Sequence, residues 1–408
     1  YHWEDAVGPM ETRIRRKNLI WGGELDPSFG TAEFIKFCRK LGAEPMICVN
    51  LASGTAEEAG NWVEYCNGTG HTYYANLRRK HGYQEPFNVK FWCIGNESYA
   101  EPDIGKQNDV QRYISDAMEF IKFMKLTDKS IKTVIVGCEK EEWNRPVLDA
   151  LHAVTDYLSV HHYSSENGQG IYGPFKGEKD LMNMIHDVAE LIDSYPDEVT
   201  DFNPWYRFPA RSNKIKIALD EWNIWEFDNN STYGLITTYC WRDALWTASV
   251  LNDIINHPSI TMANMAQMVN VLAPIMTDEN SSWYQTIAYP LRLYRHNMLG
   301  TRLESDVAEI QLDVGDASTI NALNMAAVRN DDGAIRIVVV NRDFENQYKI
   351  CLKGNAMNRS SKGSVIVLTG DFPKAVCTKE SSCVHEIVYE IDSTDVMLLP
   401  GSITMITY

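Results

Sequence analysis

Strand-like and helical segments alternate along the chain from about residue 18 to residue 300. The strand-like segments are short apolar runs, and apolar residues recur with a helical period between them, as at 31–42, 109–128 and 179–195. This alternation is typical of a parallel sheet whose strands are joined by crossover helices. The expected strands lie at residues 19–24, 44–51, 88–97, 132–138, 157–163, 214–223 and 262–272.

Seven such strands predict a (β/α)8 barrel that lacks one strand, because a closed barrel of this kind has eight. The first expected strand follows a loop with no strand before it. We therefore expect strand one to be missing from this chain. After about residue 300, short β-rich runs separated by Gly, Asn and Ser appear at 335–343, 363–371, 385–393 and 402–408. The pattern predicts an α/β catalytic barrel over residues 1–300 and an antiparallel, jelly-roll-like β-sandwich over residues 301–408.

Charge, cysteine usage and the known cofactor motifs narrow the class of protein. A formal net charge of −17 on 408 residues argues against nucleic acid or an anionic membrane as the main partner. Nine cysteines without CxxC spacing favour free, buried thiols in a reducing compartment, so we expect a cytoplasmic protein. No segment reaches 18 uninterrupted apolar residues, which predicts no membrane span. The chain has no GxGxxG after a strand, no P-loop, no GxSxG and no HExxH, so we expect no cofactor and no metal.

Two of the expected strands end in a glutamate. "NVKFWCIGNES" (88–98) ends near Glu97, and "KIKIALDEWN" (214–223) ends near Glu221. The carboxyl ends of barrel strands form the catalytic face, and alternation along the strand should put Glu97 on the same face as Cys93. Either glutamate alone could as well cap a helix or pair with an arginine. Two in matching positions predict the paired carboxylates of a glycoside hydrolase.

Polar and aromatic neighbours of the two glutamates suit sugar binding. Asn96 offers a donor and an acceptor to a ring hydroxyl. Trp222 and Trp225 could lie against sugar rings, although core packing explains each of them singly as well.

Three consecutive residues of the strand at 157–163 carry further polar groups. His161 and Tyr163 are two apart and are expected on one face, with His162 on the other. This alternation excludes a metal site built from the His161-His162 doublet, and a histidine at a strand end can be either structural or catalytic.

Five segments, in order, carry a resemblance to a known family: "YHWEDAVGP", "GAEPMICVNLASGTAEEAGNWVEYCN", "FWCIGNES", "LDEWNIW" and "MAQMVNVLAPIM". Together they resemble the α-L-arabinofuranosidases of glycoside hydrolase family 51, over essentially the whole chain. The resemblance implies a (β/α)8 barrel with a β-sandwich and a retaining mechanism. It also implies exo-acting release of terminal arabinofuranose from oligosaccharides or polysaccharides, and a homo-oligomer.

The resemblance implies roles for eight residues. Glu97 corresponds to the acid/base, Glu221 to the nucleophile, and Asn96 to an asparagine that contacts the 2-hydroxyl group. The remaining five correspond to residues that line the sugar site: His161, Tyr163 (near the nucleophile), Gln267, Trp3 and Trp225.

Two departures from the family pattern leave alternatives open. Family members begin with part of the sandwich and a first barrel strand, whereas this chain starts at Tyr1 inside the following loop, so we expect a missing N-terminal segment as a partner. The segment "ESYAEPDIG" (97–105) also differs from the usual continuation after the acid/base. The alternatives are another glycosidase of the family, an endoglucanase or a galactofuranosidase, or a catalytically inactive carbohydrate-binding fragment.

Overall fold

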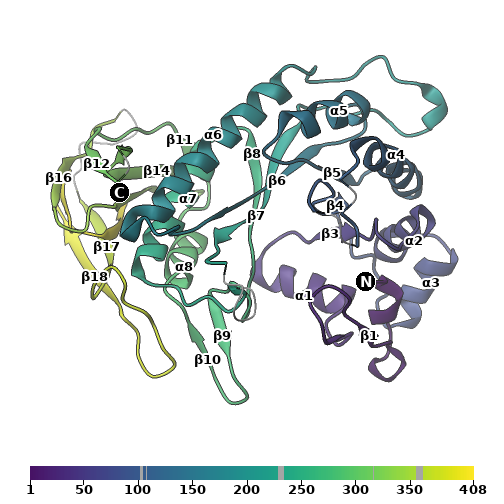
Figure 1. Cartoon of the computed structure of the whole chain (residues 1–408), viewed down its shortest axis with the longest axis horizontal. Coiled ribbons are helices and arrows are strands. Elements are labelled where there is room, and N and C mark those ends of the chain that lie inside the picture. Colours follow the sequence, from purple (N-terminus) through teal and green to yellow (C-terminus); the bar gives the residue numbers. More distant parts are fainter. Residues whose placement is uncertain (102–103, 107, 228–233, 316, 355–361) are drawn as a thin grey trace. The chain divides into compact units, whose positions relative to one another are not determined.

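The chain forms two compact units (Figure 1). The computed structural model describes residues 1–408 apart from 102–103, 107, 228–233, 316 and 355–361. Unit 1 comprises Tyr1–Val160 and Asp187–Ala218, and unit 2 comprises His161–His186 and Leu219–Tyr408.

A six-stranded sheet carries the α/β part of the chain, in the order β3-β4-β5-β6-β7-β8. Strands β3, β4, β5 and β6 pair in parallel, with Ile47 opposite Trp92 and Trp92 opposite Thr133. A closed (β/α)8 barrel needs eight strands, so the described residues supply six of them. The strands are β3 (Met46–Val49), β4 (Phe91–Ile94), β5 (Lys132–Val136), β6 (Tyr157–Ser164), β7 (Lys216–Ile224) and β8 (Ile260–Met265).

Helices alternate with these strands, and local capping signals set where they begin and end. The Thr55 side chain accepts a hydrogen bond from the backbone N–H of Glu58 at the start of α2. The Asp109 side chain accepts hydrogen bonds from the backbone N–H groups of Gln111 and Arg112 at the start of α4. Gly42 ends α1 with a φ of 67°, which glycine adopts without steric cost. The helices expected at 31–42, 109–128 and 179–195 are confirmed as α1, α4 and α6. The helices of this part are α1 (Thr31–Leu41), α2 (Ala56–Asn67), α3 (Tyr73–Lys80), α4 (Val110–Thr127), α5 (Glu141–Leu151) and α6 (Gly173–Asp193).

The expected strand at 19–24 is wrong. The chain forms there a small antiparallel hairpin of β1 (Arg16–Lys17) and β2 (Glu24–Leu25). Gly22 and Gly23 have φ values of 76° and 68°, and this left-handed backbone reverses the chain. The apolar run is the exposed tip of the hairpin, since Trp21 is 60% exposed. The parallel sheet of the described residues therefore has six of the seven expected strands.

Unit 2 contains an antiparallel six-stranded sheet in the order β11-β14-β15-β20-β17-β18. The strands expected at 335–343, 363–371, 385–393 and 402–408 are confirmed as β15, β17, β18 and β20. Separate two-stranded pairs accompany this sheet: β9 with β10, β12 with β13, and β16 with β19. The bounds are β9 (Ile275–Thr277), β10 (Ser282–Tyr284), β11 (Thr301–Leu303), β12 (Gln311–Asp313), β13 (Thr319–Asn321), β14 (Leu323–Arg329), β15 (Ile335–Asn341), β16 (Tyr348–Cys351), β17 (Gly363–Gly370), β18 (Val384–Ile391), β19 (Asp395–Leu398) and β20 (Ser402–Thr407).

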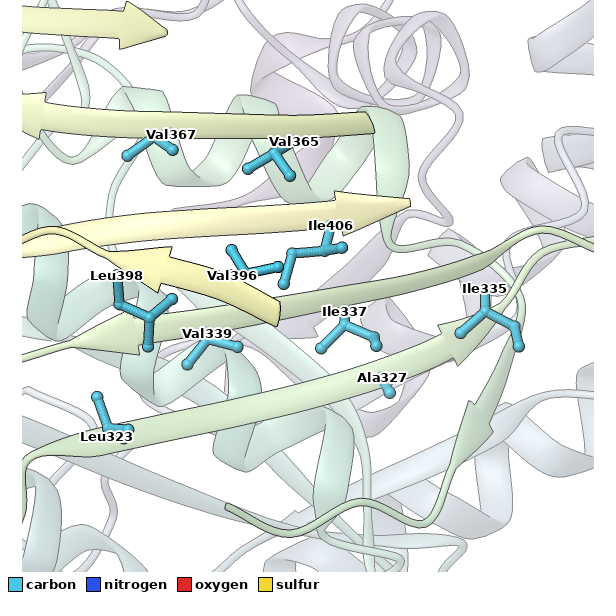
Figure 2. Close-up of a cluster of buried hydrophobic side chains, with 10 residues drawn as sticks. All are labelled: Leu323, Ala327, Ile335, Ile337, Val339, Val365, Val367, Val396, Leu398 and Ile406. Atoms are coloured by element: carbon cyan, nitrogen blue, oxygen red, sulfur yellow. The ribbon is translucent and has the colours of Figure 1, made fainter. Parts of the chain in front are cut away.

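The core of this sandwich lies between the six-stranded sheet and the strand β19 (Figure 2). Val396 and Leu398 of β19 lie over Ile337 and Val339 of β15, with Ile406 beside them. Each of these side chains is at most 5% exposed. Burying an aliphatic side chain of this size contributes about 1.5–3 kcal/mol, so the cluster holds the two layers together.

Helix α7 (Trp241–Asn256) packs on strands β14, β15 and β20 and against α8 (Ala288–Asn297). A loop between β17 and β18 caps its first turn. The N–H groups of Trp241 and Arg242 donate to the carbonyls of Ala375 (2.8 Å) and Pro373 (2.9 Å). Four short 3-10 helices complete the described secondary structure: η1 (Trp3–Ala6), η2 (Met10–Thr12), η3 (Gly170–Tyr172) and η4 (Pro204–Tyr206). Within the described part of the chain, no helix has the length and apolar character needed to cross a membrane.

A buried ion pair joins α6 to the end of β15 and gives a stability prediction. Arg342 Nη1 lies 2.5 Å from Glu178 Oε1, and both residues are buried. Burial raises the pKa of Glu178 above its ordinary 4.5, the charge of Arg342 opposes this rise, and the charge of neighbouring Asp253 adds to it. Glu178 in the unfolded chain therefore loses its proton at a lower pH than in the folded protein.

As pH rises from about 4.5 through neutrality, the contribution of Glu178 to the free energy of unfolding should fall, because the unfolded state then binds fewer protons. Glu178→Gln should flatten this slope, whereas Glu190→Gln on the exposed face of α6 should keep it. Urea unfolding of the three proteins at about pH 5 and about pH 8 measures the difference. An unchanged slope in Glu178→Gln would contradict the prediction.

Candidate active site

Glu221 lies in β7 and is held by a phenol hydroxyl from β6. Tyr163 Oη donates a hydrogen bond to Glu221 Oε2 at 2.7 Å. The Glu221 side chain is 29% exposed, so its carboxylate stays within reach of a ligand. A carboxylate held in place in this way can act as a nucleophile toward an electrophilic carbon.

His161 lies between two carboxylates of the β7 segment. Its Nδ1 is 3.7 Å from Glu221 Oε2, and its Nε2 is 3.5 Å from Asp220 Oδ1. His162 instead places Nε2 3.2 Å from Ser164 Oγ, and burial lowers its pKa. The expected alternation is confirmed, since His161 and Tyr163 both approach Glu221 and His162 does not.

Trp225 and Trp222 have different surroundings. The Trp225 ring lies 5.3 Å from the Tyr163 ring in an edge-on arrangement, beside the candidate nucleophile. Trp222 is 2% exposed and packs 5.9 Å from the ring of Trp246. The structure therefore assigns Trp222 to the core, and Trp225 alone of the pair remains a candidate sugar contact.

Gln267 follows the end of β8, in a loop anchored by a buried asparagine. Asn223 Nδ2 donates to the carbonyls of Ala266 (2.6 Å) and Leu272 (2.8 Å) and so fixes both ends of this loop. The peptide bond between Ala266 and Gln267 is cis. Gln267 is exposed, as a contact residue must be in the free protein.

In unit 1, Glu97 lies beyond the carboxyl end of β4, which stops at Ile94. The expectation that Glu97 shares a strand face with Cys93 is wrong, because the backbone turns first at Gly95, with a φ of 88°. Glu97 itself has a φ of 45°, a conformation that is uncommon for residues other than glycine and costs about 1–3 kcal/mol. Such strain is concentrated at functional sites.

Glu97 has a lysine partner that the sequence did not indicate. Lys106 Nζ donates to Glu97 Oε2 at 2.9 Å, and the two side chains are 27% and 24% exposed. Asn96 is exposed beside it, where its amide is accessible to a ligand.

Trp3 is 1% exposed and packs in the core of unit 1. Its ring stacks on Trp62 at 5.9 Å, and its Nε1 donates to the carbonyl of Glu58 at 3.1 Å. This packing accounts for the burial of Trp3, and its role at a pocket wall stays a prediction.

Comparison with known proteins identifies the family. The α-L-arabinofuranosidase 1 domain matches residues 1–181, and the α-L-arabinofuranosidase C-terminal domain matches residues 220–396. A probable α-L-arabinofuranosidase C of Aspergillus flavus is 32% identical, over 91% of this chain and 75% of that protein. The chain belongs to the α-L-arabinofuranosidases of glycoside hydrolase family 51.

Solved structures of this family share the fold. The α-L-arabinofuranosidase of Thermotoga maritima, in an arabinose complex, is 34% identical and superposes with a TM-score of 0.86 over 100% of this chain and 84% of its own. The family 51 enzyme of Thermotoga petrophila is 33% identical with a TM-score of 0.87 over the same shares. The six parallel strands and the antiparallel sheet of this arabinofuranosidase thus belong to a (β/α)8 barrel with a β-sandwich.

The sequence analysis did not single out three residues that contact the candidate site residues or their loops: Asp220, Asn223 and Lys106. Asp220 and Asn223 flank positions already singled out in "LDEWN", and the available signal was the polar residues that follow the apolar stretch Ile217–Leu219. Lys106 carried no signal, because its contact with Glu97 depends on the path of the loop after β4.

Proposed function

We propose that this protein is a retaining exo-α-L-arabinofuranosidase that releases terminal arabinofuranose from arabinose-containing oligosaccharides or polysaccharides. The observation that carries the proposal is the 2.7 Å hydrogen bond from Tyr163 to Glu221, which fixes a carboxylate in the segment expected to hold the nucleophile. A 33% identical relative, of Halalkalibacterium halodurans, is named an intracellular exo-α-(1→5)-L-arabinofuranosidase, which supports the exo mode.

Retention follows from two displacements at the anomeric carbon. Glu221 attacks this carbon and forms a glycosyl ester, the bond to the leaving oxygen breaks, and Glu97 gives its proton to that oxygen. Glu97 then removes a proton from water, which attacks the anomeric carbon and releases Glu221. Carboxyl groups about 5–5.5 Å apart are expected for this mechanism.

The ion pair of Glu97 with Lys106 affects whether Glu97 can carry the proton that the first displacement needs. An ammonium group favours the ionised form of a neighbouring carboxyl, whereas a general acid must carry a proton. We infer that Lys106 leaves Glu97 when substrate binds.

The remaining candidate residues would bind the sugar. Asn96 and Gln267 offer amide groups to ring hydroxyls, and both are exposed. Trp225, with Tyr163 at its edge, offers an apolar face, and Trp3 would act at the wall through the residues it packs against. His161 would orient Glu221.

Hydrolysis of an aryl α-L-arabinofuranoside tests the proposal, with NMR of the first-formed anomer. We expect turnover and a first product of α configuration. Aryl β-D-galactofuranoside and a soluble β-glucan distinguish the galactofuranosidase and endoglucanase alternatives. A β first product would contradict retention, and absence of turnover on all three substrates would favour a carbohydrate-binding fragment.

Removing the Tyr163 hydroxyl should reduce turnover. A hydrogen bond to a charged group contributes about 1.5–3 kcal/mol, so Tyr163→Phe should lower kcat roughly 10- to 100-fold if that contribution is lost from the transition state. Steady-state kinetics on the aryl arabinofuranoside measure this. Tyr157→Phe, in the same strand, is the matched control and should keep kcat, and an unchanged kcat in Tyr163→Phe would remove Tyr163 from the mechanism.

We further propose a cytoplasmic location and a homo-oligomer. Nine cysteines without a disulfide support a reducing compartment. The exposed apolar tip of the β1–β2 hairpin, with Leu19 68% and Trp21 60% exposed, supports self-association. Fractionation of the source cells and light scattering of the purified protein test the two points, and a monomer at micromolar concentration would contradict the second.

A further inference from the structure

Two buried thiols touch in the loop between β17 and β18. Cys377 Sγ lies 3.3 Å from Cys383 Sγ, and each residue is 5% exposed. The backbone N–H of Cys383 also points to Cys377 Sγ at 3.4 Å. Because a disulfide is about 2.0 Å long, the two sulfur atoms need to approach by only about 1.3 Å to bond.

The surroundings hold the two thiols together, and a short exposed turn connects them. Thr378 closes this turn with a hydrogen bond from its N–H to the Ser381 carbonyl at 2.8 Å. Residues 378–382 are exposed, and the hydroxyl groups of Ser382 and Tyr289 are 2.8 Å apart, which ties the turn to α8. The thiols are thus preorganised, and opening of the exposed turn would bring a reagent closer to them.

We propose that Cys377 and Cys383 form a reversible redox site that closes to a disulfide by exchange with a low-molecular-weight disulfide such as oxidised glutathione. One cysteine thiolate attacks the small disulfide, forms a mixed disulfide and releases one small thiolate. The second cysteine thiolate then attacks the protein sulfur of the mixed disulfide and displaces the other. The two protein thiols lose two protons and two electrons, and the small disulfide is reduced to two thiols.

The disulfide would act on the cap of α7. The carbonyl groups of Ala375 and Pro373 in this loop accept hydrogen bonds from the first two N–H groups of α7. Lys374 of the same loop forms an ion pair with Glu166. A cross-link between Cys377 and Cys383 restricts the chain directly after these contacts. The oxidised protein should therefore resist local opening at this end of α7.

Closure should be slow at neutral pH. Burial raises the pKa of the Cys383 thiol to about 12, and its contact with Cys377 adds to the rise. Little Cys383 thiolate is available until the turn opens, so this cysteine reacts slowly and the disulfide closes under sustained oxidation.

Peptide mapping tests the site. The native protein is incubated with oxidised glutathione, quenched with acid, alkylated under denaturing conditions and cleaved with trypsin. Cleavage after Lys374 and Lys379 gives peptides 375–379 and 380–408, each with one of the two cysteines. We expect these peptides to be joined, with the loss of two hydrogens and reversal by dithiothreitol. The exposed Cys351 should instead gain glutathione. Separate alkylated or glutathionylated peptides 375–379 and 380–408, with Cys351 modified, would overturn the proposal.

Thermal unfolding tests whether the disulfide stabilises this end of α7. Oxidised wild type should unfold a few degrees above the reduced protein, and Cys377→Ser and Cys383→Ala should both lose this difference. Cys351→Ser is the matched control and should keep it. Joined peptides without any rise in the unfolding temperature would overturn the role at the α7 cap.

Discussion

Glu221→Ala is expected to abolish hydrolysis of every arabinofuranoside, whatever its leaving group. No covalent intermediate can form without the carboxylate, and removal of an enzyme nucleophile costs on the order of 10⁶ in kcat. The loss should be the same for reactive and unreactive aryl substrates, because neither leaving-group protonation nor leaving-group acidity replaces the missing nucleophile. Initial rates with a series of aryl α-L-arabinofuranosides measure it.

Added azide gives a second test of the Glu221→Ala variant. Alanine leaves a space on the side of the sugar from which Glu221 attacks, so azide can attack there directly and give the β-arabinofuranosyl azide, with inverted configuration. Glu221→Gln should lose turnover as well, but without rescue, because the amide fills the space. Glu390→Ala, on exposed β18, is the control and should keep wild-type kinetics. Turnover of Glu221→Ala within tenfold of wild type would mean that another residue is the nucleophile.

The loss of activity in Glu97→Ala should depend on the leaving group of the substrate. General acid catalysis contributes roughly 10²–10⁴-fold, so substrates with poor leaving groups should lose about this factor in kcat/KM. An aryl glycoside with an acidic phenol needs little protonation, and its first step should survive. The glycosyl-enzyme on Glu221 should then accumulate, because no base remains to activate water. A rapid burst of phenol followed by slow steady turnover is the expected result.

Azide should rescue this second variant with the opposite stereochemistry. It needs no base, attacks the glycosyl-enzyme in place of water, and should give the α-arabinofuranosyl azide, with retained configuration. The pair of variants therefore yields two azides of opposite configuration from one substrate. Equal losses for good and poor leaving groups in Glu97→Ala, together with no azide product, would assign the acid/base role to another residue.

Periodicity in the sequence determined much of the fold. Apolar runs predicted β4 and β7 next to their glutamates, and the helical period predicted α1, α4 and α6. Alternation along one strand separated His162 from His161 and Tyr163, because neighbouring strand residues point to opposite faces. These features are local, so a single segment contains the information needed to predict them.

Short, weakly patterned segments were not predictable in this way. Strands β16 and β19 have four residues each, and their pairing joins residues about fifty positions apart, so only the assembled sandwich forms them. The run at 19–24 looked like a strand because its apolar residues dominate the pattern, whereas the backbone of Gly22 and Gly23 turned it into a hairpin. Burial separated Trp222 from Trp225, which the sequence presents alike.

The sequence by itself determined the family and the secondary structure of its long segments, and it singled out candidate residues for the chemistry. Only the tertiary structure decided which side chains meet: Tyr163 with Glu221, Lys106 with Glu97, Asn223 with the loop of Gln267, and Cys377 with Cys383. The physical reason is that a hydrogen bond or sulfur contact depends on distances of a few ångströms, and loop paths and long-range packing set those distances.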